Sequence, residues 1–76
     1  MGMLNTKHID ITDSQYQKLL DYPNTLNRDN IEHIFVYQYY LGDKKIDCIG
    51  VTWTTINSSY ELTLNFSIED FNKNFN

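Results

Sequence analysis

Residues 33–68 constrain the fold most, because their apolar runs and polar turns are typical of three consecutive β-strands. Successive side chains of a strand point to opposite faces, so residues two apart share a face. The last strand, predicted over 60–68, alternates regularly between apolar and polar residues. Its apolar row consists of Tyr60, Leu62, Leu64, Phe66 and Ile68. This pattern predicts a sheet with one dry face and one solvated face.

The two preceding strands, predicted over 33–41 and 45–56, carry more apolar surface than one buried face can use. One row of the first strand holds His33, Phe35, Tyr37, Tyr39 and Leu41, and the other row, also largely apolar, holds Ile34, Val36, Gln38 and Tyr40. In the second strand the apolar phase changes near Gly50, which a β-bulge there would explain. Without a bulge, Val51 and Trp53 would lie on the face opposite to the strand's first apolar residues. Either arrangement places bulky apolar groups on the second face of the sheet.

The connections between these strands favour hairpins. Gly42-Asp43 lies where a two-residue loop needs positive φ, which glycine adopts without steric cost and aspartate tolerates. Asn57-Ser58-Ser59 is a polar segment of the length expected for a second hairpin. The three strands are therefore predicted to form an antiparallel meander.

The segment before the meander predicts a fourth, short strand over 7–11 and a helix over 13–21. Polar and apolar residues alternate in the strand. Thr12 followed by Gln15 fits a capping box at the start of the helix. Pro23 disfavours helical geometry in Tyr22, the residue before it, so the helix should end by about Asp21.

A second, short helix is predicted over 68–75. Ser67 followed by Asp70 is a cap signature, and Phe71 and Phe75 are four residues apart, on one helical face. A helix this short is marginal in water. We therefore expect its two phenylalanines to be buried against the sheet or a partner.

Together the elements predict a single α+β domain over residues 1–76, in which one or two helices cover one face of a small antiparallel sheet. The opposite face is the candidate interface, because aromatic side chains supply large contact area at low entropic cost. Phe35, Tyr60 and Phe66 are expected in the core. The predicted interface residues are Tyr37, Tyr39, Tyr40 and Trp53, which cannot all be buried on one side of the sheet.

The charge balance excludes some partners. A net charge of −4 argues against direct binding to nucleic acid or to an anionic membrane, both of which need clustered lysine and arginine. No apolar run approaches the ~20 residues that span a bilayer, and no secretory signal is evident, so we expect a cytoplasmic protein. Cys48, the single cysteine, is expected to be a small buried hydrophobe. The leading Met1-Gly2 pair is expected to be an addition ahead of a native start at Met3.

Catalytic and metal-binding motifs are not evident. His8 and His33 stand at no spacing that indicates a triad with Cys48 or Ser14. His8 and Asp10 share a strand face, but two ligands are too few for a structural metal site. We therefore expect no catalytic residue, no cofactor and no metal.

The leading hypothesis is a non-catalytic protein-interaction domain that uses an aromatic sheet face for self-association or for binding a protein partner. The alternative is an acidic inhibitor that blocks a host nucleic-acid-binding protein or defence enzyme, with Asp43, Asp47 and Glu61 as candidate contacts. Abundant asparagine and the absence of alanine suggest an AT-rich genome. A bacterial or phage source is therefore expected, and a phage protein would act in the host cytoplasm.

Overall fold

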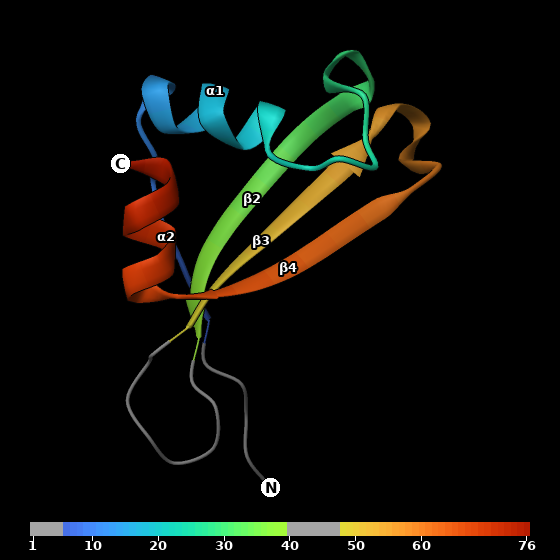
Figure 1. The fold of residues 1–76 in the computed structure, drawn as a ribbon. Helices are drawn as coiled ribbons and strands as arrows, with labels where there is room; N and C mark the ends of the chain where they lie inside the picture. The colour runs from blue at the N-terminus through green and yellow to red at the C-terminus, as the bar shows by residue number, and fades with distance from the viewer. Residues whose placement is uncertain (1–5, 40–47) are drawn as a thin grey trace, which may run out of the picture.

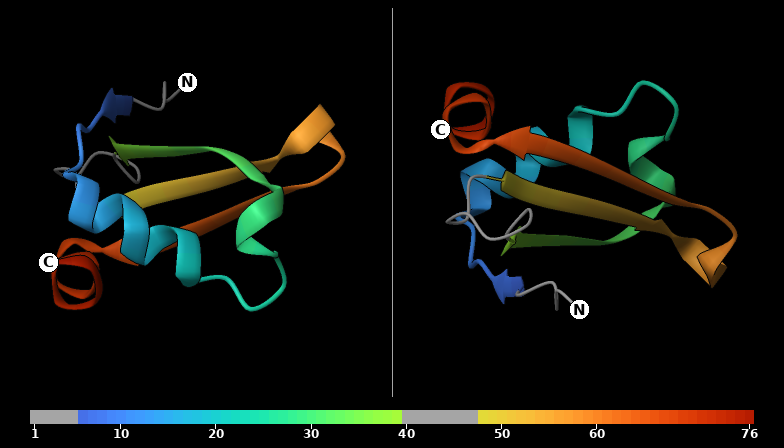
Figure 2. Two further views of the ribbon diagram at one scale, coloured as in Figure 1. Left: turned by 90° about the horizontal axis from the view of Figure 1, so that it is seen from above. Right: turned by 90° about the horizontal axis from the view of Figure 1, so that it is seen from below.

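A four-stranded antiparallel sheet in the order β1-β2-β3-β4 carries both helices on one of its faces (Figure 1 and Figure 2). The computed structural model describes residues 6–39 and 48–76. The elements are β1 (Thr6–His8), α1 (Asp13–Asp21), the 3₁₀ helix η1 (Arg28–Asn30), β2 (Ile31–Tyr39), β3 (Cys48–Thr55), the 3₁₀ helix η2 (Ile56–Ser58), β4 (Glu61–Ser67) and α2 (Ile68–Phe75). The predicted α+β class is confirmed.

The ends of the elements differ from the prediction mainly in the strands. Strand β1 is shorter than the predicted 7–11, and its pairing with β2 continues only through the bond from the Ile9 amide to the Val36 carbonyl at 2.9 Å. The predicted turn at Gly42-Asp43 lies outside the described residues. The second connection contains the single 3₁₀ turn η2, in which Asn57 has a φ of 66°. This left-handed conformation is one that asparagine tolerates better than most residues.

Of the two arrangements considered for the second strand of the meander, the structure has the one without a bulge at Gly50. Strand β3 keeps an unbroken register with both neighbours through this residue, and the irregularity lies instead in β2, between Ile31 and His33. The regular register places Gly50 directly opposite Tyr37, whose ring lies over the glycine. The glycine is therefore required by a close side-chain approach, while the bulge in β2 lets Ile31 join Val36 in the core.

Trp53 lies at the centre of the core, which fills the space between the sheet and the helices. Its side chain is fully buried, and its indole Nε1 donates a hydrogen bond to the Leu19 carbonyl at 2.8 Å. The ring of Tyr22 stacks near it, with ring centroids 6.2 Å apart and planes 8° from parallel. The sheet is thus tied to the end of α1 by both an apolar and a polar contact, so the indole's only polar atom is satisfied in the core.

The caps of both helices form as predicted. The Thr12 hydroxyl accepts from the Gln15 amide, and the Gln15 side chain accepts from the Thr12 amide, which completes the capping box. The hydroxyl of Ser67 accepts from the Asp70 amide at 3.1 Å. Gln15 and Lys18 also donate to Asn76, so α1 holds the end of α2 in place.

The two phenylalanines of α2 are buried, as this short helix requires. Phe71 is 5% exposed and Phe75 is 1% exposed. Their rings contact each other and Phe66 of β4, with centroid distances between 5.1 and 6.4 Å. Aromatic packing against the sheet therefore supplies the stability that the isolated helix lacks.

Candidate functional site

The face of the sheet turned away from α1 and α2 is the candidate site, and Figure 2 shows it in the right-hand view with no helix in front of it. Residues paired across antiparallel strands share a face, so the register defines which side chains belong to it. We call this surface the outer face. It consists of Thr6 and His8 from β1, His33, Phe35, Tyr37 and Tyr39 from β2, Cys48, Gly50, Thr52 and Thr54 from β3, and Glu61, Thr63, Asn65 and Ser67 from β4.

An aromatic row of Phe35, Tyr37 and Tyr39 runs along β2 on the outer face. Phe35 is 45% exposed, which is unusual for a phenylalanine in the middle of a strand. Tyr37 and Tyr39 have ring centroids 5.9 Å apart, and His33 lies 5.8 Å from Phe35 by the same measure. The row therefore presents the exposed ring of Phe35 and the half-buried ring of Tyr37 beside the hydroxyl-rich strands β3 and β4.

Contacts with the neighbouring strand hold Tyr37 in place. Its ring covers Gly50 so closely that a Cβ on the glycine would lie 2.5 Å from the Tyr37 Cε2 atom. Its hydroxyl lies 3.5 Å from the Thr52 Oγ1 atom, which in turn lies 3.0 Å from the Thr63 Oγ1 atom. A chain of hydroxyl groups thus crosses three strands and orders the middle of the outer face before any partner binds.

Tyr39 closes one end of the aromatic row and is largely buried. Burial raises the pKa of its hydroxyl, and the neighbouring Cys48 and Tyr37 raise this pKa further. Its phenol therefore keeps its proton at neutral pH. This end of the row consequently presents an uncharged ring and hydroxyl.

The structure divides the predicted interface residues between two environments. Tyr37 and Tyr39 lie on the outer face, Tyr40 lies outside the described residues, and Trp53 lies in the core. Trp53 is thus not available to a partner, because the absence of a bulge in β3 turns it toward the helices. The opposite holds for Phe35, which is predicted in the core but is exposed on the outer face. Its two-residue spacing from Tyr37 is the signal that places it on the outer face.

The other two aromatic residues expected in the core also differ from each other. Phe66 is half-buried and packs against the core, as predicted. Tyr60 is 50% exposed, because it precedes the first residue of β4 and lies beside a cavity at the end of the sheet. The predicted role of Tyr60 as a core residue is therefore wrong.

Charge is sparse on the outer face. Among its described residues Glu61 is the only carboxylate, and none is lysine or arginine. The other two acidic residues proposed as inhibitor contacts, Asp43 and Asp47, lie outside the described residues. Cys48 is half-buried at the edge of the outer face rather than fully buried. The surface chemistry of the outer face is therefore aromatic and hydroxylic.

Both histidines lie near a carboxylate in the described ranges 6–39 and 48–76. His8 Nε2 lies 3.8 Å from Asp10 Oδ1, and His33 Nε2 lies 3.9 Å from Glu32 Oε1. Within these ranges no group of three or more histidine, cysteine, aspartate or glutamate residues lies close enough to hold a metal ion. Both pairs are exposed.

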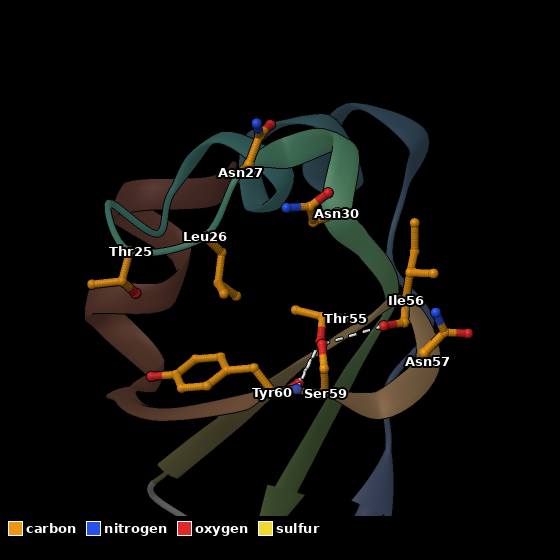
Figure 3. A pocket seen from close by; sticks show the side chains of 9 residues that line it. All are labelled: Thr25, Leu26, Asn27, Asn30, Thr55, Ile56, Asn57, Ser59 and Tyr60. Atoms are coloured by element: carbon orange, nitrogen blue, oxygen red, sulfur yellow. Dashed lines mark hydrogen bonds between the residues drawn. The ribbon is translucent and has the colours of Figure 1, made fainter.

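A cavity of about 510 Å³ opens at the other end of the sheet, beneath the loop that precedes β2 (Figure 3). Its lining consists of Thr25, Leu26, Asn27, Asn30, Thr55, Ile56, Asn57, Ser59 and Tyr60. The Thr55 hydroxyl is already engaged with Ser59 and with both backbone groups of Tyr60. The lining has no histidine, cysteine, carboxylate or amine, so Tyr60 is its one ionisable side chain.

Comparison with known proteins finds no matching protein-family model, no significantly similar curated protein and no significantly similar solved structure. In the part of the chain that the structure describes, neither helix is long and apolar enough to cross a membrane. The basis for a functional proposal is therefore the geometry of the outer face itself.

Proposed function

We propose that this chain is a non-catalytic protein-interaction domain that binds a protein partner through its outer face, with a second copy of the chain as one such partner. The observation that carries the proposal is the exposed ring of Phe35 in an ordered aromatic row on the face that the helices leave uncovered. Aromatic side chains are enriched at protein-interaction sites.

The order of the aromatic row supports this function. Tyr37 is held by its contact with Gly50 and by the hydroxyl chain through Thr52, so it loses little conformational freedom when a partner covers it. Preorganised side chains lower the entropic cost of association. Aromatic groups have few rotatable bonds and add to this advantage.

The charge of the outer face supports aromatic burial over electrostatic mimicry. Its one carboxylate, Glu61, stands at the end of β4, two strands away from the aromatic row on β2. Association through aromatic burial should depend little on salt, whereas an acidic inhibitor of a nucleic-acid-binding protein should bind much more weakly at high ionic strength.

The first test is the molar mass by light scattering on a sizing column, across protein concentrations and at low and high salt. A dimer that persists at high salt would support self-association through the outer face. Phe35→Ser should then shift the mass toward that of the monomer. Tyr60→Ser is the matched control, because Tyr60 has a similar exposure but lies off the outer face.

A monomer under all conditions would direct the test to a heterologous partner. The wild type and the same two variants would be compared as immobilised baits, with the salt-resistant partner expected on the wild type and on Tyr60→Ser only. A partner retained equally by Phe35→Ser, or one released by moderate salt, would contradict the proposal. Release by salt would favour the acidic-inhibitor alternative.

A further inference from the structure

Strand β4 is an open edge of the sheet. Among the described strands it pairs only with β3, and its register from Glu61 to Ser67 is unbroken. The opposite edge is formed by β1, which has only three residues and so offers little edge for pairing. Strand β4 is longer and has no proline, lysine or bulge, which are the features that usually block edge pairing.

The phase of the β3–β4 ladder shows which backbone groups of β4 face outward. The Thr55 amide donates to the Tyr60 carbonyl at 3.1 Å, so this pair is hydrogen-bonded. Hydrogen-bonded and non-hydrogen-bonded pairs alternate along an antiparallel ladder. The amides and carbonyls of Glu61, Thr63 and Asn65 therefore point to the open side, where the described residues offer them no backbone partner.

A second cavity, of about 460 Å³, lies beside the same strand. Leu62 and Leu64 line it from β4, and the opposite wall is formed by Tyr22, Pro23, Asn24 and Thr25. In both views of Figure 2 the loop that connects α1 to η1 projects beyond the β4 edge of the sheet. The cavity wall therefore overhangs the position that an added strand would occupy.

The wall is held firmly by the core. Tyr22 stacks on Trp53, and its ring also contacts Phe66 and Phe75 edge-on at centroid distances of 5.6 and 5.1 Å. Pro23 is buried. Because facing residues of paired strands share a face, the side chains opposite Leu62 and Leu64 on an added strand would enter this cavity.

The charge around this edge selects the chemistry of the added strand. Glu61 lies at one end of β4, and Glu69 and Asp70 follow its other end in the first turn of α2. Residues 61–72 contain no lysine or arginine, and neither does the cavity wall. Positive side chains near the ends of an added strand would therefore meet carboxylates, whereas acidic ones would be repelled.

We propose that the β4 edge and its adjoining cavity bind an extended, basic segment of a partner protein, which adds a strand to the sheet. The backbone of the segment bonds to Glu61, Thr63 and Asn65, and its alternate apolar side chains fill the cavity beside Leu62 and Leu64. This is recognition by strand addition, in which backbone bonds supply affinity and side-chain pockets supply specificity. The site shares the backbone of Glu61, Thr63 and Asn65 with the margin of the outer face, but it lies two strands away from the aromatic row on β2 and goes beyond the function proposed for that row.

The test uses a panel of fluorescently labelled peptides of about nine residues, the length of a typical strand. Each peptide alternates threonine with valine, leucine or phenylalanine and has lysine or glutamate at both ends. Anisotropy should show binding of lysine-ended members, with glutamate-ended members about tenfold weaker. Hydrogen exchange should slow at the amides of Glu61, Thr63 and Asn65 when a binding peptide is added.

Matched variants separate this site from general charge effects. Glu61→Lys should weaken the lysine-ended peptides about fivefold, and Asp10→Lys, which changes the net charge equally at an exposed position away from β4, should have little effect. Thr63→Pro removes an outward amide while sparing the ladder to β3 and should abolish binding. Circular dichroism would confirm that this variant is folded, and Thr25→Trp, which fills the cavity, provides a second blocking change.

Several outcomes would overturn the proposal. In the binding assay, these are no binding by any peptide of the panel or an equal loss of affinity in Glu61→Lys and Asp10→Lys. In the exchange experiment, these are peptide-dependent protection of amides outside β4, or protection of the β4 amides by a second copy of the chain without any peptide. Phe35→Ser should leave peptide binding unchanged, because it alters only the aromatic row on β2, two strands away from the β4 edge. A loss of peptide binding in that variant would show that the two surfaces are one site.

Discussion

The two faces of the sheet contain similar residue types, but one face is buried under the helices and the other is exposed. On the inner face, Trp53 and Val51 are fully buried against the helices, whereas on the outer face Phe35 stays exposed and Tyr37 is half-buried. Strand β2 contributes apolar groups to both faces. The difference teaches that aromatic content alone does not separate the core from a binding surface, because the helices decide which face is covered.

The largest expected effect is the loss of Trp53 from the inner face. Trp53→Ala should lower the free energy of unfolding by about 3–5 kcal/mol, because it leaves a cavity between α1 and the sheet. Urea denaturation would measure it. Trp53→Phe should cost less, since it keeps a ring but loses the bond to the Leu19 carbonyl. A cost below about 1 kcal/mol for Trp53→Ala would contradict the central place of this residue in the core.

A smaller effect is expected where the outer face contacts its own backbone. Gly50→Ala should destabilise the protein by about 1–3 kcal/mol, because the new methyl group displaces the ring of Tyr37. In a Tyr37→Ser background the same change should be neutral or stabilising, since alanine costs less conformational entropy than glycine. A double-mutant cycle from denaturation curves measures this coupling. Additive effects would show that the ring does not depend on Gly50.

Replacing the exposed ring of Phe35 should change the stability of the protein still less. Phe35→Ser should change the free energy of unfolding by about 0.5 kcal/mol or less, because its ring is largely in water already. Parallel urea curves for wild type and variant would measure the difference. A loss comparable to that of Trp53→Ala would show that the outer face is part of the core, and would remove the contrast between the two faces.

The smallest expected effect is confined to alkaline pH. The pKa of Tyr39 is raised above the ordinary 10.0, so its contribution to stability is fully present below pH 10.0 and is lost as the pH rises through the raised value. Tyr39→Phe should therefore remove part of the fall in stability above pH 10.0. Denaturation curves for both proteins across this range would test it, and identical pH profiles would contradict the raised pKa.

Much of the local structure could be predicted from the sequence. The capping residues Thr12 and Ser67 mark the starts of the two helices, and the alternation in β4 identifies Leu62 and Leu64 as inner-face residues. These features depend on neighbours a few residues away, so short patterns specify them. Of the four predicted interface residues, Tyr37 and Tyr39 lie on the outer face, in one row of β2.

The rest of the site depends on contacts that a short pattern does not contain. The exposure of Phe35 and the burial of Trp53 follow from which face the helices cover, and the open edge of β4 follows from the strand order. The cavity beside β4 exists because Tyr22 packs on the core and carries its loop over the edge.

The sequence by itself determined the kinds of elements and the two rows of side chains on each strand, because helix caps and strand alternation are local properties. Only the tertiary structure decided which row became the core, where the bulge in β2 fell and which edge stayed open. The physical reason is that both rows of β2 are apolar, so burial of either satisfies the local pattern. Packing of Leu19, Phe71 and Phe75 against Trp53 selects one of the two faces.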